Sequence, residues 1–546
     1  MIFPKPQKLC LQRKISTPSG FKITGDETAF SQKILSGNGI NTFDGTYTVE
    51  IKIEDTEETS YIAQLSALTD EKYYIYLGEK DCRIVTSCKK GLYRALQTFS
   101  RIVLKGEFFT GTIEDYPLFT NRGYIEGFYG KQWEQEKRLS VMKLMAQNGM
   151  NTYFYAPKDD VYHREKWAEE YPPAELENLR TLFSFATENF MSFTWCVGPG
   201  LTYCYTDKND FERLIGKFRQ LYGIGIKSFG LLLDDIADDF QYEADKEKYS
   251  NIVYAHTELV NKVYKALKEL DADIHLTVCP TQYFGDEHGF YIQKFGTSVP
   301  SEVSVFWTGA EICSRVLTSR EAKEFILGTN HKPLFWDNFP VNDCEMFQEM
   351  HLNYIEGRDK DLYKYSDGLI SNVMEYAECS KIPLLTVCDY LWNPAVYNGA
   401  ESLKNAQYTV LGDKTEKFFY FADHLGVSCL NKYSSGYMSD TLRNIYFYYN
   451  SGEKEKAFGI FNDYLKAVNS CNEMLKEDFP IFNELKKWSG KFAKSCKLLE
   501  LLKLTMENPN EENKDILKTE LEKYNSDAVI LTGFCLREAA EKALLL

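Results

Sequence analysis

Between Arg122 and about Val373, the chain alternates between two hydrophobic patterns. Short apolar runs, rich in β-branched and aromatic residues, are separated by longer amphipathic stretches. There are eight such runs: Gly123–Tyr129, Asn151–Ala156, Ser192–Val197, Ser228–Leu233, Ile274–Cys279, Val303–Trp307, Pro333–Trp336 and Gly368–Asn372. Runs of this length and composition are typical of buried strands.

The stretches between these runs mostly show helical periodicity. Apolar residues recur at roughly helical spacing between the fourth and fifth runs, at Ile252, Leu259, Val263, Leu267 and Leu270. Leu139, Met142 and Met145 do the same between the first and second runs, and Gly149 is a helix-stop signal. Eight strands alternating with helices over about 250 residues predict a (β/α)8 barrel. The eighth unit has the least regular pattern.

The segments before and after the predicted barrel differ in their hydrophobic patterns. In the N-terminal flank, Tyr73–Leu77 and Arg83–Thr86 are predicted strands, and Gly91–Val103 is a predicted helix with one apolar side. After about Ala400 the pattern is helical to the end, for example in Leu485–Leu504 and Asn513–Tyr524. We therefore expect an α/β protein with three domains. They are an N-terminal α+β domain (1–118), a central (β/α)8 TIM barrel (119–400) and a C-terminal helical domain (401–546).

Active sites of such barrels lie at the C-terminal ends of the strands. The residues at those ends are largely acidic, amide-bearing or aromatic. They are Gly127 and Tyr129; Lys158, Asp159 and Asp160; Gly198, Pro199 and Gly200; Asp234 and Asp235; Gln282 and Tyr283; Thr308 and Gly309; Asp337, Asn338 and Asp343; and Asn372, with Trp307 and Trp336 nearby. Carboxylates and amides that bind hydroxyls, beside aromatic faces, indicate a carbohydrate pocket. Lys158 could be a Schiff-base lysine, but its neighbours Asp159 and Asp160 favour a charged, hydrogen-bonding lysine.

The pair Asp234-Asp235 directly follows the apolar run Leu231-Leu232-Leu233. Two adjacent carboxylates at the end of a buried strand repel, so at least one should resist ionising, and one acid can then stay protonated beside one carboxylate. Two other interpretations are an N-cap in a solvated loop and a magnesium-diphosphate motif, since Asp234 to Asp238 fits DDxxD. The second occurs in all-helical enzymes with a second acidic motif, and we find no such motif here.

Composition and charge restrict the partners and cofactors. The 546 residues contain 63 Lys and Arg and 79 Asp and Glu, so the net charge is −16 and neither nucleic acid nor an anionic membrane is the expected main partner. No apolar run is long enough to span a bilayer. The seven His residues lack metal-ligand spacing, no GxxxxGK[ST] phosphate loop occurs, and we expect no metal and no cofactor.

The cysteines and the first residues bear on location. The 14 Cys are scattered without a CxxC motif, which favours reduced thiols over disulfides. The segment Met1-Ile-Phe-Pro-Lys-Pro6 has no signal-like apolar stretch, so we expect a cytoplasmic protein. The alternative is a secreted protein whose chain was trimmed.

Six ordered motifs resemble those of glycoside hydrolase family 84, the β-N-acetylglucosaminidases that include O-GlcNAcases and bacterial homologues. They are Arg122–Gly130 (RGYIEGFYG), Asn151–Asp160 (NTYFYAPKDD) with Tyr162–Arg164 (YHR), Leu233–Ile236 (LDDI), Cys279–Tyr283 (CPTQY), Trp307–Gly309 (WTG) and Trp336–Asn338 (WDN). The resemblance covers the predicted barrel, about half of the chain. Two small departures are Ala237, where a further Asp is common, and Gln282, where Glu also occurs.

The resemblance implies a retaining exo-β-N-acetylglucosaminidase that uses substrate-assisted catalysis, an exception to the scheme with a carboxylate nucleophile. The substrate's own 2-acetamido oxygen would attack the anomeric carbon and form an oxazoline. Asp234 would orient and stabilise the acetamido group, and Asp235 would be the general acid and base. Tyr283 would hydrogen-bond the acetamido oxygen with support from Asn338.

By the same resemblance, the remaining site residues would bind the sugar. Trp336, Tyr283 and Cys279 would enclose the acetyl methyl group. The sugar hydroxyls would be bound by Gly127 through its carbonyl, Lys158, Asp343 and Asn372. Tyr129 and Trp307 are either site residues or packing aromatics.

The expected partner is a GlcNAc-bearing glycan or glycoprotein, although the loops that would select the aglycone carry no recognisable motif. The C-terminal helices could pack on the barrel or on another subunit. Two further hypotheses stay open, a catalytically silent sugar-binding barrel and an ordinary retaining glycosidase with a carboxylate nucleophile.

Overall fold

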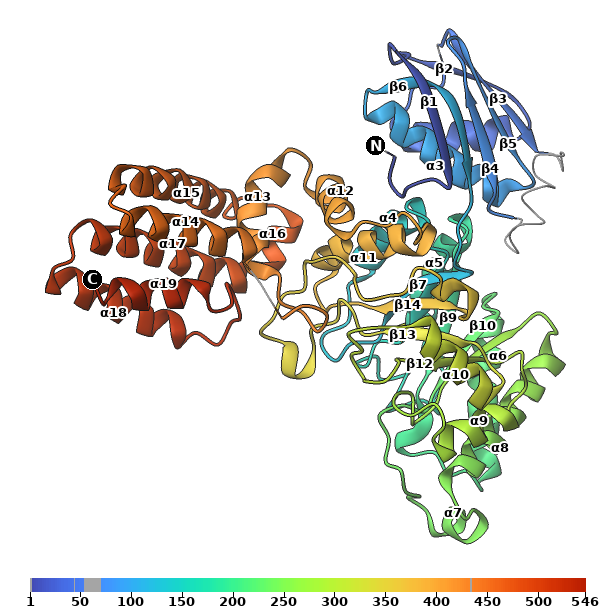
Figure 1. The fold of residues 1–546 in the computed structure, drawn as a ribbon. Coiled ribbons are helices and arrows are strands. Elements are labelled where there is room, and N and C mark those ends of the chain that lie inside the picture. Colours follow the sequence, from blue (N-terminus) through green and yellow to red (C-terminus); the bar gives the residue numbers. More distant parts are fainter. Residues whose placement is uncertain (1, 44, 54–69, 433–434) are drawn as a thin grey trace.

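The structure is a computed structural model that describes residues 2–43, 45–53, 70–432 and 435–546. Figure 1 shows three parts, with the barrel joined to a sheet domain at its N-terminal side and to a helical domain at its C-terminal side. Among the described residues, no helix is both long and apolar enough to cross a bilayer.

Eight parallel strands close into the central barrel in chain order. They are β7 (Asn121–Glu126), β8 (Thr152–Tyr155), β9 (Ser192–Val197), β10 (Ser228–Leu232), β11 (His275–Cys279), β12 (Ser304–Trp307), β13 (Pro333–Asp337) and β14 (Gly368–Asn372). Each predicted apolar run overlaps one of these strands, and β14 closes the barrel by pairing with β7. The predicted fold class is confirmed.

Helices cover the outer face of the barrel, which buries the strands on both sides and explains their nearly continuous apolar runs. They are α4 (Gln135–Gln147), α5 (Pro173–Glu188), α6 (Lys208–Tyr222), α8 (Ile252–Leu270), α9 (Phe290–Ser298), α10 (Ser319–Thr329) and α11 (Ala377–Trp392), while the short α7 (Glu243–Lys248) lies in the connection between β10 and α8. The periodic stretches predicted as helices are α4 and α8. The chain from β13 to β14 holds only the short 3-10 turns η2 (Cys344–Met346) and η3 (Leu362–Lys364), which explains the irregular pattern before the eighth run.

The N-terminal domain is a six-stranded mixed sheet in the order β1-β6-β4-β5-β3-β2, packed against helices. Within the described residues, its strands are β1 (Lys8–Ile15), β2 (Phe21–Gly25), β3 (Tyr47–Ile53), β4 (Tyr73–Leu77), β5 (Asp81–Thr86) and β6 (Phe108–Asp115), and its helices are α1 (Thr28–Gly37) and α3 (Lys89–Leu104). The predicted strands Tyr73–Leu77 and Arg83–Thr86 are β4 and most of β5, and the predicted helix lies inside α3.

A buried ionic junction fixes this domain to the barrel. Glu71 accepts hydrogen bonds from Arg94 of α3 at 2.8 Å and from Arg122 of β7 at 2.7 and 2.8 Å. All three side chains are almost fully buried. Burial raises the pKa of the Glu71 carboxyl, but the two guanidinium groups outweigh that effect and hold its pKa below the usual range.

The C-terminal part is helical, as predicted. Its helices are α12 (Gly399–Leu411), α13 (Thr415–Ala422), α14 (Gly436–Asn450), α15 (Lys454–Met474), α16 (Pro480–Glu484), α17 (Lys486–Glu507), α18 (Glu511–Asn525) and α19 (Cys535–Ala543). The predicted division at residues 118 and 400 stays a prediction; the first barrel strand begins at Asn121 and α12 begins at Gly399.

Candidate active site

The two-residue repeat of the strands aims one set of side chains into the barrel. Residues from all eight strands form the inner cluster, including Leu232, Trp336 and Ile370, whereas their neighbours Leu231 and Phe335 belong to the outer core. Two residues beyond an inner position, the side chain again faces the barrel axis. Five predicted site residues stand at this spacing: Gly127 after Ile125, Lys158 after Ala156, Asp234 after Leu232, Asn338 after Trp336 and Asn372 after Ile370.

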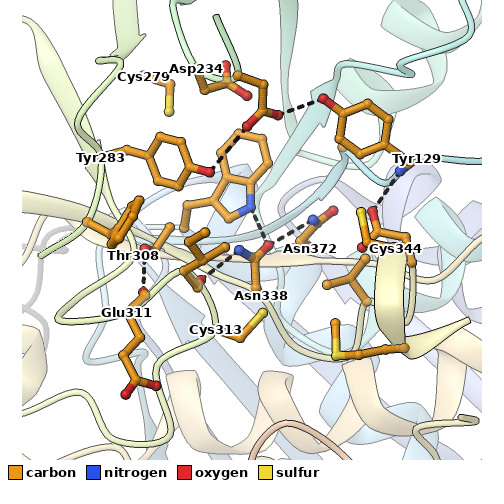
Figure 2. Close-up of a pocket in the computed structure, with 18 of the residues that line it drawn as sticks. Tyr129, Asp234, Cys279, Tyr283, Thr308, Glu311, Cys313, Asn338, Cys344 and Asn372 are labelled. Atoms are coloured by element: carbon orange, nitrogen blue, oxygen red, sulfur yellow. Dashed lines mark hydrogen bonds between the residues drawn. The ribbon is translucent and has the colours of Figure 1, made fainter. Parts of the chain in front are cut away.

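These residues line one pocket of about 640 Å³ at the carboxyl end of the barrel (Figure 2). All ten predicted site residues contribute to it. They are Gly127, Lys158, Asp234, Asp235, Cys279, Tyr283, Trp336, Asn338, Asp343 and Asn372, and Tyr129 lines it too. The volume suits a small ligand such as one sugar ring with its substituents.

Asp235 reaches the pocket through an unusual backbone conformation. Regular pleating would turn the side chain after Asp234 to the outer face, beside Leu233. Asp235 instead has φ 53°, in the left-handed region, just after β10 ends at Leu232. Non-glycine residues rarely adopt this conformation, and such strain is concentrated at functional sites. It lets two consecutive carboxylates point into the same pocket.

Asp234 is a buried carboxylate whose charge is matched by Lys158. Lys158 Nζ lies 2.9 Å from Asp234 Oδ2 and 3.5 Å from Asp235 Oδ2, and the Lys158 and Asp234 side chains are each 6% exposed. Burial raises the pKa of Asp234, but the Lys158 charge and hydrogen bond outweigh it, so the pKa is lowered. Asp234 is therefore ionised at neutral pH.

The same contact keeps Lys158 protonated. Burial lowers the pKa of its ammonium group, but Asp234, Tyr129 and Asp235 together raise it above its usual value. The sequence predicted a charged lysine, with Asp159 and Asp160 as its partners. In the structure Asp159 instead accepts from the Gln132 backbone N–H, and Asp160 accepts from two tyrosine hydroxyls. A Schiff-base role, which needs a neutral amine, is disfavoured.

Two tyrosines hold the carboxylate of Asp235. The Tyr129 hydroxyl donates to Oδ2 at 2.7 Å, and the Tyr283 hydroxyl donates to Oδ1 at 3.3 Å. Arg164 donates to the Tyr129 hydroxyl at 3.0 Å and to the backbone carbonyl of Asp235 at 3.2 Å. Tyr129 is thus a pocket residue rather than a packing aromatic.

The carboxamide of Asn338 organises the opposite wall. Its Oδ1 accepts from Trp336 Nε1 and from Asn372 Nδ2, both at 2.9 Å, and its Nδ2 donates to the Ile312 carbonyl at 2.8 Å (Figure 2). Within the described part of the chain, Asn372 Oδ1 is buried without a hydrogen-bond partner. A buried carbonyl left in this way favours a ligand that brings a donor, such as a hydroxyl.

Gly127 and Asp343 shape the rest of the floor. A Cβ atom on Gly127 would lie 2.7 Å from Trp336 Cζ2 and 3.3 Å from Asn372 Oδ1, so no larger side chain fits here. Asp343 accepts from the Tyr129 backbone N–H at 2.7 Å, and burial raises the pKa of its carboxyl.

Some residues from the strand ends lie elsewhere. Trp307 is buried outside the pocket, where it stacks on Phe325 and packs against Phe335, so it is a packing aromatic. Asp337 faces outward and pairs with Arg358. The segment after Asp234 is not helical and Asp238 is exposed, unlike the helical DDxxD motif of the magnesium hypothesis. The described residues hold no group of three or more metal-ligating side chains.

The pocket also has residues that the sequence did not single out. Phe284, Ile312, Cys313, Cys344 and Met346 line it from the loops after β11, β12 and β13. No spacing pattern in the sequence distinguishes these residues from other loop residues. Arg164 belongs to the Tyr162–Arg164 motif, but only the structure shows that it supports Tyr129.

The barrel region is similar in sequence to known proteins. A family model described as beta-N-acetylglucosaminidase matches residues 122–423. The protein O-GlcNAcases of Rattus norvegicus and Mus musculus are each 31% identical over 283 residues, which is 51% of this chain. The match spans about 30% of the length of those curated relatives.

Solved structures extend the similarity beyond the barrel. A mutant O-GlcNAc hydrolase from Thermobaculum terrenum is 29% identical with a TM-score of 0.74, covering 78% of this chain and 95% of that one. CpGH84B is 24% identical and CpGH84D 20%, and both alignments cover all of this chain. CpGH84B is covered completely with a TM-score of 0.85, and CpGH84D to 98% with a TM-score of 0.81. These last two show a shared fold over the full chain.

Proposed function

Because the chain belongs to the beta-N-acetylglucosaminidase family, glycoside hydrolase family 84, we propose that it removes terminal β-linked N-acetylglucosamine with retention of configuration. The observation that carries the proposal is the convergence of Asp234, Asp235 and Lys158 in one sugar-sized pocket. Two relatives are named protein O-GlcNAcase, so a GlcNAc-modified protein is the first substrate to test and a GlcNAc-terminated glycan the second.

In the proposed reaction the substrate's acetamido oxygen is the nucleophile. It attacks the anomeric carbon, the glycosidic bond breaks, and an oxazoline forms with positive charge on the acetamido group. Asp234 accepts a hydrogen bond from the acetamido N–H and balances that charge. Its charged state supports this role, since a buried carboxylate that is already ionised costs no reorganisation during the reaction.

Asp235 is the proposed general acid and base. It donates a proton to the leaving oxygen and later accepts one from the water that opens the oxazoline, so a single group serves both steps. Its side chain is 33% exposed, whereas that of Asp234 is 6% exposed. The exposed position suits proton exchange with water, and the buried position suits a fixed charge. The hydroxyls of Tyr129 and Tyr283 orient Asp235 toward the pocket.

The remaining contacts would hold the sugar ring. When substrate binds, the Tyr283 hydroxyl turns its single proton from Asp235 to the acetamido oxygen. Cys279, Trp336 and Tyr283 enclose the acetyl methyl, and Asn338 fixes the Trp336 indole. Asn372 Oδ1, which has no hydrogen-bond partner within the described residues, accepts from a sugar hydroxyl. Lys158, Asp343 and the Gly127 carbonyl complete the hydroxyl contacts.

A pair of nitrophenyl glycosides tests the nucleophile. The protein should release nitrophenol from 4-nitrophenyl β-N-acetylglucosaminide and leave 4-nitrophenyl β-glucoside, which lacks the acetamido group, unreacted. Comparable turnover of both would assign the nucleophile to an enzyme carboxylate. Binding of N-acetylglucosamine by calorimetry without turnover of either would establish the silent sugar-binding barrel instead.

A further inference from the structure

A second cavity, of about 820 Å³, lies where the helical domain meets the barrel. It is larger than the candidate active site of about 640 Å³, and the two cavities share no lining residue within the described chain. Its walls include the loop at residues 352–354, helices α12 and α13, and the start of α14. Figure 1 shows α12 and α13 between the barrel and the remaining C-terminal helices. The proposed reaction does not use this cavity.

Three aromatic rings form one corner of the cavity. Phe419 and Tyr420 of α13 and Tyr437 of α14 have ring centroids 5.3 to 5.9 Å apart and ring planes at 76 to 78°. Phe419 is 42% exposed and Tyr437 is 45% exposed. Tyr354, from the barrel loop, adds a fourth ring to the lining. Exposed aromatic faces that gather in a cavity favour a ligand with an apolar face.

Two of these rings are held in place by the neighbouring backbone. The N–H groups of Tyr437 and Met438 both donate to the Asp423 carboxylate at 3.0 Å, which fixes the first turn of α14. The Tyr354 ring lies against Gly399, the first residue of α12, where a Cβ atom would be 2.1 Å from Tyr354 Cδ2. A cavity whose aromatic groups are already ordered loses less conformational entropy when a ligand binds.

Uncharged polar groups complete the lining. Asn353, Gln407 and Asn431 supply carboxamides, and Thr415 and Ser435 supply hydroxyls. Ser435 is 1% exposed, and its hydroxyl has no hydrogen-bond partner in the part of the chain that the structure describes. Buried polar groups are normally paired, so this hydroxyl favours a ligand that brings donors and acceptors of its own.

The charges and the backbone of the lining disfavour other ligand classes. Among the described lining residues, Lys404 is the one cation, and it faces the carboxyl groups of Glu416 and Asp423, so an anionic ligand gains no net attraction. The described lining residues belong to helices and loops and not to strands, so no sheet edge is available to an extended peptide. A neutral ligand with apolar faces and many hydroxyl groups fits this lining best, and carbohydrates have both.

We propose that this cavity is a second carbohydrate-binding site, which takes a short neutral oligosaccharide. The C–H faces of its sugar rings lie against Phe419 and Tyr437, and its hydroxyls bond to Asn353, Gln407 and Ser435. Binding here does not depend on the proposed hydrolysis. No motif of the sequence analysis included these residues, because they come from separate helices and a barrel loop.

Calorimetry on the full chain tests the site with cellotriose and maltotriose, and with N,N′,N″-triacetylchitotriose in the Asp235→Ala variant, which should not cleave it. We expect at least one of these trisaccharides to bind, and its affinity at this site to fall about tenfold in Phe419→Ala and in Tyr437→Ala. Phe447→Ala changes a 62% exposed phenylalanine of α14 outside the described lining and should bind like the wild type. Thermal unfolding verifies that the variants are folded.

The chitotriose can also occupy the candidate active site, so its stoichiometry should fall from near two to near one in the cavity variants. Trigalacturonate, an acidic trisaccharide, should not bind at this site.

The proposal is overturned if none of the three neutral trisaccharides binds at millimolar concentration, or if Phe419→Ala and Tyr437→Ala bind them as the wild type does. Binding of trigalacturonate that is lost in these two variants would also overturn it, since the site would then select anions. The proposed function has a separate readout, hydrolysis of 4-nitrophenyl β-N-acetylglucosaminide, which both variants should retain. If no preparation hydrolyses the glycoside, the proposed function fails, and calorimetry with cellotriose and maltotriose still decides whether the cavity binds carbohydrate.

Discussion

Replacing Lys158 by methionine removes the charge that keeps Asp234 ionised while retaining a similar side-chain length. The ammonium lies 2.9 Å from Asp234 Oδ2, and both side chains are 6% exposed. Removing one partner of a buried ion pair costs about 3–5 kcal/mol, because the other charge stays buried without compensation. If about 3 kcal/mol of this is lost at the transition state, kcat/KM falls roughly 160-fold.

The pH dependence separates this effect from a lost contact to the sugar. In the wild type, Lys158 overcomes the effect of burial and lowers the pKa of Asp234. Without Lys158 only burial and weaker contacts remain, so the pKa of Asp234 rises. The acidic limb of the kcat/KM profile should then move to higher pH, because the carboxylate becomes protonated at a higher pH.

The lowered pKa of Asp234 also affects how the free energy of unfolding depends on pH. A lowered folded-state pKa contributes stability above the unfolded-state pKa, and this contribution is lost as pH falls through the folded-state value. Lys158→Met should therefore lower the free energy of unfolding most at neutral pH and least in acid, as urea titrations at several pH values would measure. Lys131→Met, at an exposed lysine, is the control. If the acidic limb of the kcat/KM profile stays at the wild-type pH in Lys158→Met, Lys158 does not control the ionisation of Asp234.

Three other substitutions give distinct readouts. Asp235→Ala should lower kcat/KM at least 100-fold for a sugar leaving group but less than tenfold for nitrophenol, which needs little protonation; equal losses would remove Asp235 as the acid. Gly127→Ala, whose Cβ would overlap Trp336, should raise KM about tenfold. The control Gly216→Ala, whose Cβ meets nothing within 4 Å, should leave KM unchanged. An unaltered KM in Gly127→Ala would place the sugar elsewhere. Tyr129→Phe, which loses the bond to Asp235, should lower kcat/KM three- to tenfold, with circular dichroism as the folding control; wild-type kinetics would show that the bond does not orient Asp235.

Much of the barrel could be predicted from the sequence because each strand is buried on both faces. β10 and β14 are therefore mainly apolar, and polar residues such as Asp234 and Asn338 follow within two residues of a strand end. Because side chains alternate between the two faces of a strand, residues two positions beyond an inner-facing residue point into the pocket. The N-terminal sheet was only partly predicted, since edge strand β1 is exposed along almost its whole length and lacks an apolar pattern.

The remaining features depend on contacts between distant segments. The left-handed backbone at Asp235, a non-glycine residue, turns the second carboxylate into the pocket. The partners of Lys158 lie 76 and 77 residues away along the chain, so its nearest sequence neighbours suggested the wrong carboxylates.

The most direct test of the central claim is nitrophenol release from 4-nitrophenyl β-N-acetylglucosaminide by the wild type and Asp234→Asn, with EDTA present. Asparagine keeps the size of the side chain but removes its charge, and thermal unfolding would verify that the variant is folded. We predict that wild-type turnover survives EDTA and that kcat/KM of Asp234→Asn falls at least 100-fold. Near-wild-type turnover by Asp234→Asn, or loss of wild-type turnover in EDTA, would contradict catalysis by the acetamido group under the control of Asp234.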